Sequence, residues 1–354
     1  MKILQKTLFV LLIAFLFGCG TKNKEIVINL DEIKDVTSEK FINLNIVDNK
    51  GDAVYFNKIR DIIFSADSHI IVICDSIVQL DKDGNFKKYI ERPDTGPRVF
   101  NNTRETGIYY NGNHYITDNS RQNLLQKYDK DMNYLTSYKI KIPYTMAFIN
   151  ENEILSINEK SDKHIFCILD TLGNVIKSFG DIEGNEEGVI EEVLKPGDIE
   201  KKKEKIDMQF VYDTLYKHIF LFSNYEPIIR RFDLNGKLLQ RINLEAAFFD
   251  KKRSETEETK QMFANTPGVM VFTHYIMKPS IVEGKKLLIN IPDFGSLVLK
   301  YDDKNITDKS VIKYETVTVD SVENKQVIPN LSLKDFNSIK LLYDYKNIFV
   351  NIKK

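Results

Sequence analysis

Residues 78–86 read Val78-Gln-Leu-Asp-Lys-Asp-Gly-Asn-Phe86, and this phrase decides the fold because the chain repeats it four more times. In each copy an apolar run ends in Leu, Tyr or Phe followed by Asp, and Gly or a substitute stands three residues after that Asp. The other copies are Gln126-Lys-Tyr-Asp-Lys-Asp-Met-Asn-Tyr134, Cys167-Ile-Leu-Asp-Thr-Leu-Gly-Asn-Val175, Arg230-Arg-Phe-Asp-Leu-Asn-Gly-Lys-Leu238 and Leu299-Lys-Tyr-Asp-Asp-Lys-Asn-Ile306.

The phrase has the chemistry of a tight β-hairpin. An Asp side chain accepts hydrogen bonds from the backbone two residues further on and so favours a turn. The Gly, or Asn305 in the fifth copy, supplies the left-handed backbone that tight hairpin loops need. The flanking runs either alternate or are wholly apolar, which is typical of strands in stacked sheets.

Two further candidate strands precede each phrase, for example residues 59–65 and 70–74 before the first copy. Four strands per unit at a period above about 40 residues is typical of a β-propeller. A sixth unit combines residues 338–343 and 347–352 with 25–30 and 41–47. The sequence therefore predicts an all-β fold over residues 26–354: a six-bladed β-propeller with four-stranded antiparallel blades, the last blade closed by N- and C-terminal strands. Two stacked β-sandwiches do not explain the repetition, whereas five or seven blades remain open.

The first nineteen residues indicate a protein that is exported to the cell envelope. Lys2 and Lys6 precede a run of apolar residues from Leu8 to Phe17, which has the length of a signal-peptide core and is too short to span a bilayer. Leu16-Phe17-Gly18-Cys19 resembles the lipobox of bacterial lipoproteins, which implies a signal peptide over residues 1–18, lipidation of Cys19 and a tether over residues 19–25. A plain secretory signal is the alternative. No Asp follows Cys19, which favours the outer membrane.

The repeats and this N-terminus together resemble the six-bladed β-propeller lipoproteins of Bacteroidetes, relatives of the NHL-repeat propellers. That family often carries a GxGPxE(Y/F)-like stretch after its first full blade. Residues 94–100, Asp94-Thr-Gly-Pro-Arg-Val-Phe100, match its Gly-Pro and its final aromatic residue but have Val99 in place of the Glu. The resemblance covers nearly all of residues 26–354 and implies architecture and location more than activity.

Composition excludes several classes of protein. The formal net charge of −1 argues against a nucleic-acid binder, and 3 Cys with 5 His argue against a Cys-rich metal or disulfide scaffold. Cys74 and Cys167 stand in apolar runs and are expected to be core thiols, a disulfide being the alternative. No HExxH, GxSxG or Walker motif occurs. These features favour a monomeric, non-catalytic binding protein without a cofactor, anchored to a membrane by lipid.

The long connections between blades indicate which face binds a ligand or protein partner. Residues 91–105, 180–207 and 245–275, the last with a helix from about Phe249 to Phe263, all fall on one face of the predicted ring. Binding sites commonly lie on such loops. The candidate binding residues on this face and at the axial channel mouth are Arg60, Asp61, Arg98, Arg104, Glu105, Asp118, Asn119, Asn224, Tyr225 and Asp293. The three arginines suit a carboxylate or phosphate group.

An alternative function is a calcium-assisted hydrolase or lyase. Propeller lactonases and related hydrolases resemble this architecture and hold calcium in the axial channel with carboxylates and amides, ligands that suit this ion. The candidates here are Asp61, Glu105, Asp118, Asn119, Asn158, Asn224 and Asp293. Four histidines, His69, His114, His164 and His218, stand beside the second strand of their units, where a polar strand start is a better explanation than a metal ring.

Overall fold

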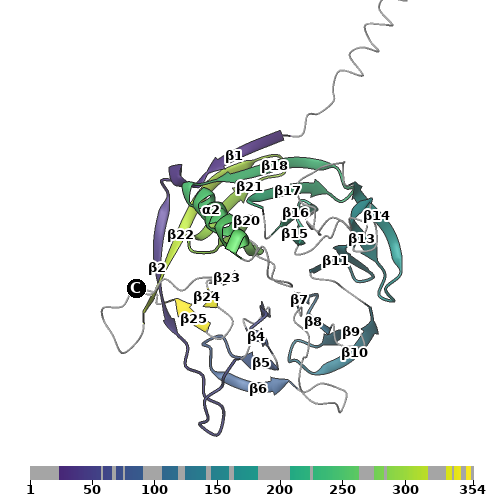
Figure 1. Ribbon diagram of the computed structural model, residues 1–354. Helices are drawn as coiled ribbons and strands as arrows, with labels where there is room; N and C mark the ends of the chain where they lie inside the picture. The colour runs from purple at the N-terminus through teal and green to yellow at the C-terminus, as the bar shows by residue number, and fades with distance from the viewer. Residues whose placement is uncertain are drawn as a thin grey trace, which may run out of the picture.

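The chain folds as an all-β propeller of mainly antiparallel sheets arranged around a central axis (Figure 1). This computed structural model describes residues 24–56, 59–65, 69–74, 76–90, 106–118, 124–140, 145–158, 163–181, 208–223, 226–262, 275–282, 285–317, 332–336, 339–343 and 348–351. In the three four-stranded sheets the chain runs outward strand by strand from the axis, and the predicted four-stranded antiparallel units are confirmed.

The first three sheets follow the chain in order. They consist of β3 (Asp61–Phe64), β4 (Ile70–Ile73), β5 (Ile77–Leu80) and β6 (Phe86–Ile90); β7 (Gly107–Tyr110), β8 (Asn113–Asp118), β9 (Leu124–Tyr128) and β10 (Tyr134–Lys139); and β11 (Met146–Asn150), β12 (Glu153–Ile157), β13 (His164–Leu169) and β14 (Val175–Asp181).

The fourth sheet has five strands because β1 joins it. Its antiparallel strands are β15 (Met208–Asp213), β16 (His218–Ser223), β17 (Ile228–Asp233) and β18 (Leu238–Glu245). The sequence predicts residues 25–30 in the closing blade, but β1 (Lys24–Asn29) instead lies parallel to β18 on the outer edge of the fourth sheet, with Lys24 opposite Gln240. The 3-10 helix η1 (Leu30–Glu32) then turns the chain toward the closing strand.

Hydrogen bonding joins the remaining strands into one sheet, so the described residues form five blades and not the predicted six. This eight-stranded sheet is built from β19 (Met277–Val282), β20 (Lys286–Ile291), β21 (Gly295–Tyr301), β22 (Ile306–Val317), β2 (Val36–Asn43), β25 (Ile348–Asn351), β24 (Ile339–Tyr343) and β23 (Ser332–Phe336), in that order. The reason is the length of β22. Its 12 residues extend past the 7 of β21, and its second half pairs in parallel with β2.

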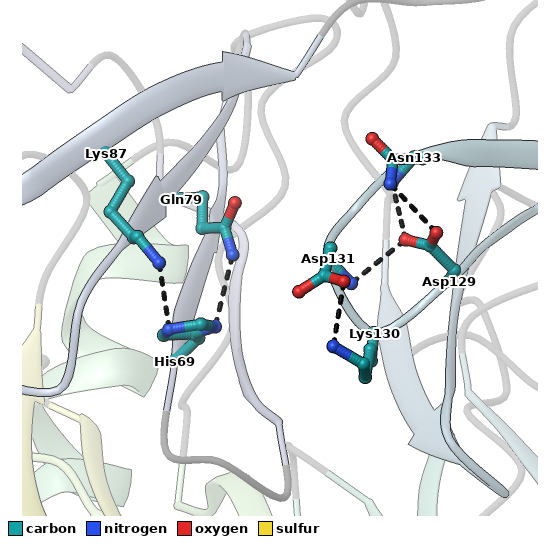
Figure 2. Close-up of polar contacts among 7 residues, drawn as sticks. All are labelled: His69, Gln79, Lys87, Asp129, Lys130, Asp131 and Asn133. Carbon is teal, nitrogen blue, oxygen red and sulfur yellow. Dashed lines mark hydrogen bonds and ion pairs between the residues drawn. The ribbon is translucent and has the colours of Figure 1, made fainter.

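The repeated phrase forms the predicted turn. In all five copies one carboxylate oxygen of the Asp accepts backbone N–H bonds from residues further along the turn, such as Asp131 and Asn133 for Asp129 at 2.9 and 2.8 Å (Figure 2). The hydrogen bond from the Asn174 side chain, with bonds from the turn backbone, lowers the pKa of Asp170 from its ordinary value. The turn therefore favours the ionised carboxylate.

The left-handed position varies between copies. Gly84, Gly173 and Gly236 take φ values of 85 to 87°, and Met132 takes the same region in the second copy with φ 64°. Asn305 does not, because the fifth turn is one residue shorter and closes with a bond from Asp302 N to the Asn305 carbonyl.

Apolar strand faces pack between neighbouring sheets to form the core. The inner strands are almost entirely buried, as in β4 and β16. Cys74 and Cys167 lie in these layers as buried thiols that are not joined in a disulfide, so the prediction of core thiols is confirmed. Among the described residues no helix has the length and apolar character needed to cross a membrane.

The closing strand β2 supplies a sharp test of ring stability. Phe41 is fully buried and packs with Leu288, Val298 and Leu333 from both halves of the eight-stranded sheet. Phe41→Ala is expected to lower the free energy of unfolding by about 3–5 kcal/mol, because it leaves a cavity in that core. Val36 on the same strand is 49% exposed, so Val36→Ala should change it by less than about 0.5 kcal/mol. Urea unfolding of both variants measures the difference, and equal effects would contradict this role for β2.

Candidate functional site

A cluster of polar groups links the innermost strands on the face that carries the long connections. Asp61, the first residue of β3, accepts hydrogen bonds from the Thr106 hydroxyl at 3.1 Å and from the Gly107 N–H at 3.3 Å. Its other oxygen accepts from the Ile62 N–H at 2.9 Å and lies 3.3 Å from Lys334 Nζ. The Asp61 and Lys334 side chains are only 14% and 19% exposed. This axial cluster therefore joins β3, β7 and β23.

The axial cluster does not fit a calcium site. Both oxygens of Asp61 are already engaged, one of them by a cation. Asn158 is buried and donates to the Ser178 hydroxyl at 3.0 Å, and Asp293 forms an ion pair with Lys252 at 2.8 Å. These candidate ligands are thus held in different places, and within the described ranges no three His, Cys, Asp or Glu residues gather to hold a metal.

The structure describes only some of the other candidate residues that the sequence predicts. Arg60 precedes β3 and its backbone N–H donates to the Ile73 carbonyl at 2.8 Å, while Asp118 ends β8. Several predictions lie outside the described residues. They are Cys19, Arg98, Arg104, Glu105, Asn119, Asn224 and Tyr225, with the link 91–105 and most of 180–207.

The third link builds a cavity at the rim of the same face, which sequence reasoning missed. The predicted helix is present as α2 (Ala247–Met262). Its first turn, the end of β18 and the segment around η1 enclose about 420 Å³. The cavity is lined by Asn29, Asp31, Pro227, Leu244, Glu245, Ala246, Ala247, Phe249, Asp250 and Arg253. We call this space the rim cavity.

Contacts from three directions hold α2 in place. Asp31 accepts a hydrogen bond from the Ala247 N–H at 2.8 Å, which satisfies one free donor of the first helical turn. Lys252 pairs with Asp293, and the Phe248 ring stacks on Phe294 with centroids 5.0 Å apart. The helix is therefore docked against the loop between β20 and β21.

The lining of the rim cavity carries an excess of negative charge. Asp31, Glu245 and Asp250 contribute three carboxylates, and Arg253 contributes one guanidinium, 3.5 Å from Asp250. Leu244 and Phe249 also border the cavity, but both side chains are buried in the core beneath it. The charge of this lining favours a ligand that carries a positive group.

The described histidines contact neighbouring side chains of the scaffold. His69 is held by Gln79 Nε2 at 3.3 Å and Lys87 Nζ at 3.0 Å (Figure 2). His218 Nδ1 accepts from the buried Arg231 at 2.8 Å, and burial together with that guanidinium lowers the pKa of His218. His164 begins β13, the third strand of its unit, so it does not share the position of the others. The predicted polar strand start thus describes His69, His114 and His218, which stand at or next to the start of β4, β8 and β16.

Comparison with known proteins gives a fold and no family. No protein-family model matches the chain. No curated protein matches it either. It is similar to a protein of Bacteroides fragilis that is provisionally named as exported, with 12% identity, a TM-score of 0.53, and coverage of 93% of this chain and 99% of that one. This likeness shows a shared fold.

Two further solved structures show weaker likeness. One is a member of the DUF4221 family from Bacteroides vulgatus, with 11% identity, a TM-score of 0.48, and coverage of 90% of this chain and 97% of that one. The other is virginiamycin B lyase from Staphylococcus aureus, with 11% identity, a TM-score of 0.46, and coverage of 88% and 98%.

The axial ion pair can be tested by a double-mutant cycle. Asp61→Ala leaves the Lys334 ammonium in a largely buried site without its carboxylate, and we expect it to lower the free energy of unfolding by about 3 kcal/mol. Lys334→Ala should cost less, because Thr106 and Gly107 still bind the carboxylate. In urea unfolding, the loss of free energy in the double variant should be smaller than the sum of the two single losses by at least about 1 kcal/mol. Additive effects would contradict the coupling.

Proposed function

We propose that this protein is a lipid-anchored, non-catalytic propeller of the bacterial cell envelope that binds a small cationic ligand in the rim cavity. One observation carries the binding site. The link that the sequence singles out closes over η1 to form a space of about 420 Å³, within the range of about 300–1,000 Å³ typical of small-molecule sites.

The charge of the lining supports a cationic ligand. Three carboxylates face one guanidinium. Asp250 is partly neutralised by Arg253, and one oxygen of Asp31 accepts the Ala247 N–H, so Glu245 and the second oxygen of Asp31 remain to attract a positive group.

The state of the described polar groups supports a non-catalytic role. General acid or base chemistry needs a titratable group within reach of substrate. Asp61 is bound by Lys334 and Thr106, and His218 is buried against Arg231. These groups serve the scaffold, so binding is the function that the described part of the chain supports best.

The N-terminal sequence supports the envelope location. Gly18-Cys19 after a short apolar run is typical of a lipidated N-terminus, and lipid chains give stable anchoring where more than one is attached. The similar Bacteroides fragilis protein is itself provisionally named as exported. The absence of Asp after Cys19 favours the outer membrane.

Matched probes test the rim cavity. Benzylamine and benzoate share a ring and differ in charge, and we expect benzylamine alone to raise the melting temperature and to bind saturably in calorimetry. Glu245→Lys with Asp250→Lys should abolish that binding. Glu258→Lys is the control, because Glu258 is exposed on α2 and does not line the cavity. Equal binding of both probes, or binding that survives the double reversal, would refute the assignment.

Cell fractionation tests the anchor. Cys19→Ser should move the protein from the membrane fraction to the soluble envelope fraction and remove incorporation of labelled fatty acid, because Cys19 is the proposed attachment site. Cys74→Ser is the control, since Cys74 is buried in the core. Unchanged membrane association of Cys19→Ser would show that lipid does not anchor the chain.

A further inference from the structure

A second cavity lies on the opposite face of the ring, between the sheet β7–β10 and the sheet β11–β14. It encloses about 200 Å³ at the ends of β7 and β11, beside the short turns. Its lining consists of Tyr110, Asn111, Asn113, Tyr115, Leu125, Lys127, Tyr138, Phe148, Glu151, Asn152, Ile154 and Thr171. We call it the junction pocket. It is separate from the rim cavity, with which it shares no residue.

The floor of the junction pocket is a cluster of packed rings. Tyr110 stacks on Phe148 with centroids 4.8 Å apart and planes at 13°, and Tyr115 lies 4.3 Å from the same ring. Phe148 is buried, whereas Tyr110 and Tyr138 are only partly covered. The pocket therefore presents rigid aromatic surface, whose two-torsion side chains lose little entropy when a ligand binds.

Polar groups of both kinds surround this floor. The Asn111 side chain donates to Glu151 Oε1 at 2.5 Å, which ties the turn of one sheet to the turn of the next. Asn113, Asn152 and Thr171 place amide and hydroxyl groups around the same opening. Such groups both donate and accept hydrogen bonds, and so does every hydroxyl of a sugar.

Charge restricts the ligand further. Lys127 Nζ lies 5.5 Å from the centre of the Tyr115 ring, so the pocket's own cation already occupies the aromatic face that a cationic ligand would seek. The volume lies below the roughly 300–1,000 Å³ of drug-sized sites, which limits the occupant to a single ring. A pyranose fits both limits, because it is neutral and has apolar C–H faces and a hydroxyl edge.

We propose that the junction pocket binds one neutral monosaccharide unit. The C–H face of the sugar packs on the partly exposed rings of Tyr110 and Tyr138, and its hydroxyls bond to the amide side chains around the opening. This sugar site is separate from the rim cavity, and it lies on the face of the ring opposite the long connections between blades.

The test uses saturation-transfer NMR on the full-length chain with glucose, galactose, mannose, N-acetylglucosamine and choline as separate probes. We expect saturable millimolar binding of at least one sugar and none of choline. Tyr138→Ala should weaken it about tenfold by removing a stacking wall. Tyr134→Ala is the matched control, since Tyr134 lies on the same strand, is 40% exposed and does not line the pocket.

A second variant guards against loss of fold. Asn152 is exposed at the opening of the junction pocket, so Asn152→Ala should weaken sugar binding severalfold without changing the melting temperature. The proposal is overturned if none of the four sugars binds, if choline binds in their place, or if sugar binding is the same in Tyr138→Ala and Tyr134→Ala.

Discussion

A ring of sheets is stable only where its first and last strands are joined, and β2 makes that joint. It pairs in parallel with β22 from Val36 to Ile42 and antiparallel with β25 from Phe41 to Asn43. Unjoined, β22 and β25 would both present open edges, which invite association with other chains. Phe41 adds a buried ring at the centre of the same sheet. Near the axis, an ion pair between Lys334 and Asp61 connects β23 to β3. The ring is therefore closed by strand hydrogen bonds at its outer edge and by this ion pair near its axis.

This closure makes the two faces of the ring chemically different. Every repeated phrase turns on one face within a few residues, because its Asp accepts the backbone donors of the turn. The chain can therefore lengthen only on the other face without disturbing these turns. The docked helix α2 and the rim cavity lie there, where insertions leave the scaffold intact.

Local chemistry could be predicted from the sequence, whereas partners distant in the chain could not. The turn aspartates and their glycines follow from short-range rules, and the structure obeys those rules even at Met132. The short apolar run Ile26-Val27-Ile28 fits any sheet edge, so no local signal in the sequence distinguished pairing with β18 from pairing in the closing sheet. Asp293 matches a calcium ligand by type, yet its partner Lys252 lies 41 positions earlier. The junction pocket, likewise, exists only through the spacing of two separate sheets.

Equivalent positions of the repeat carry different side chains at two of the junctions between sheets. Arg231 and Lys127 each stand two residues before a turn Asp, and each lies 5.5 Å from an aromatic ring on the adjacent strand, Phe220 or Tyr115. Arg231 is 1% exposed, and its guanidinium reaches the Asp302 carbonyl of the next sheet, so it fills its junction. Lys127 instead ends in an ammonium group that lies over the Tyr115 ring of its own sheet, and it lines the junction pocket. The same position of the repeat therefore holds a side chain that bonds to the next sheet in one case and a side chain that lines a cavity in the other.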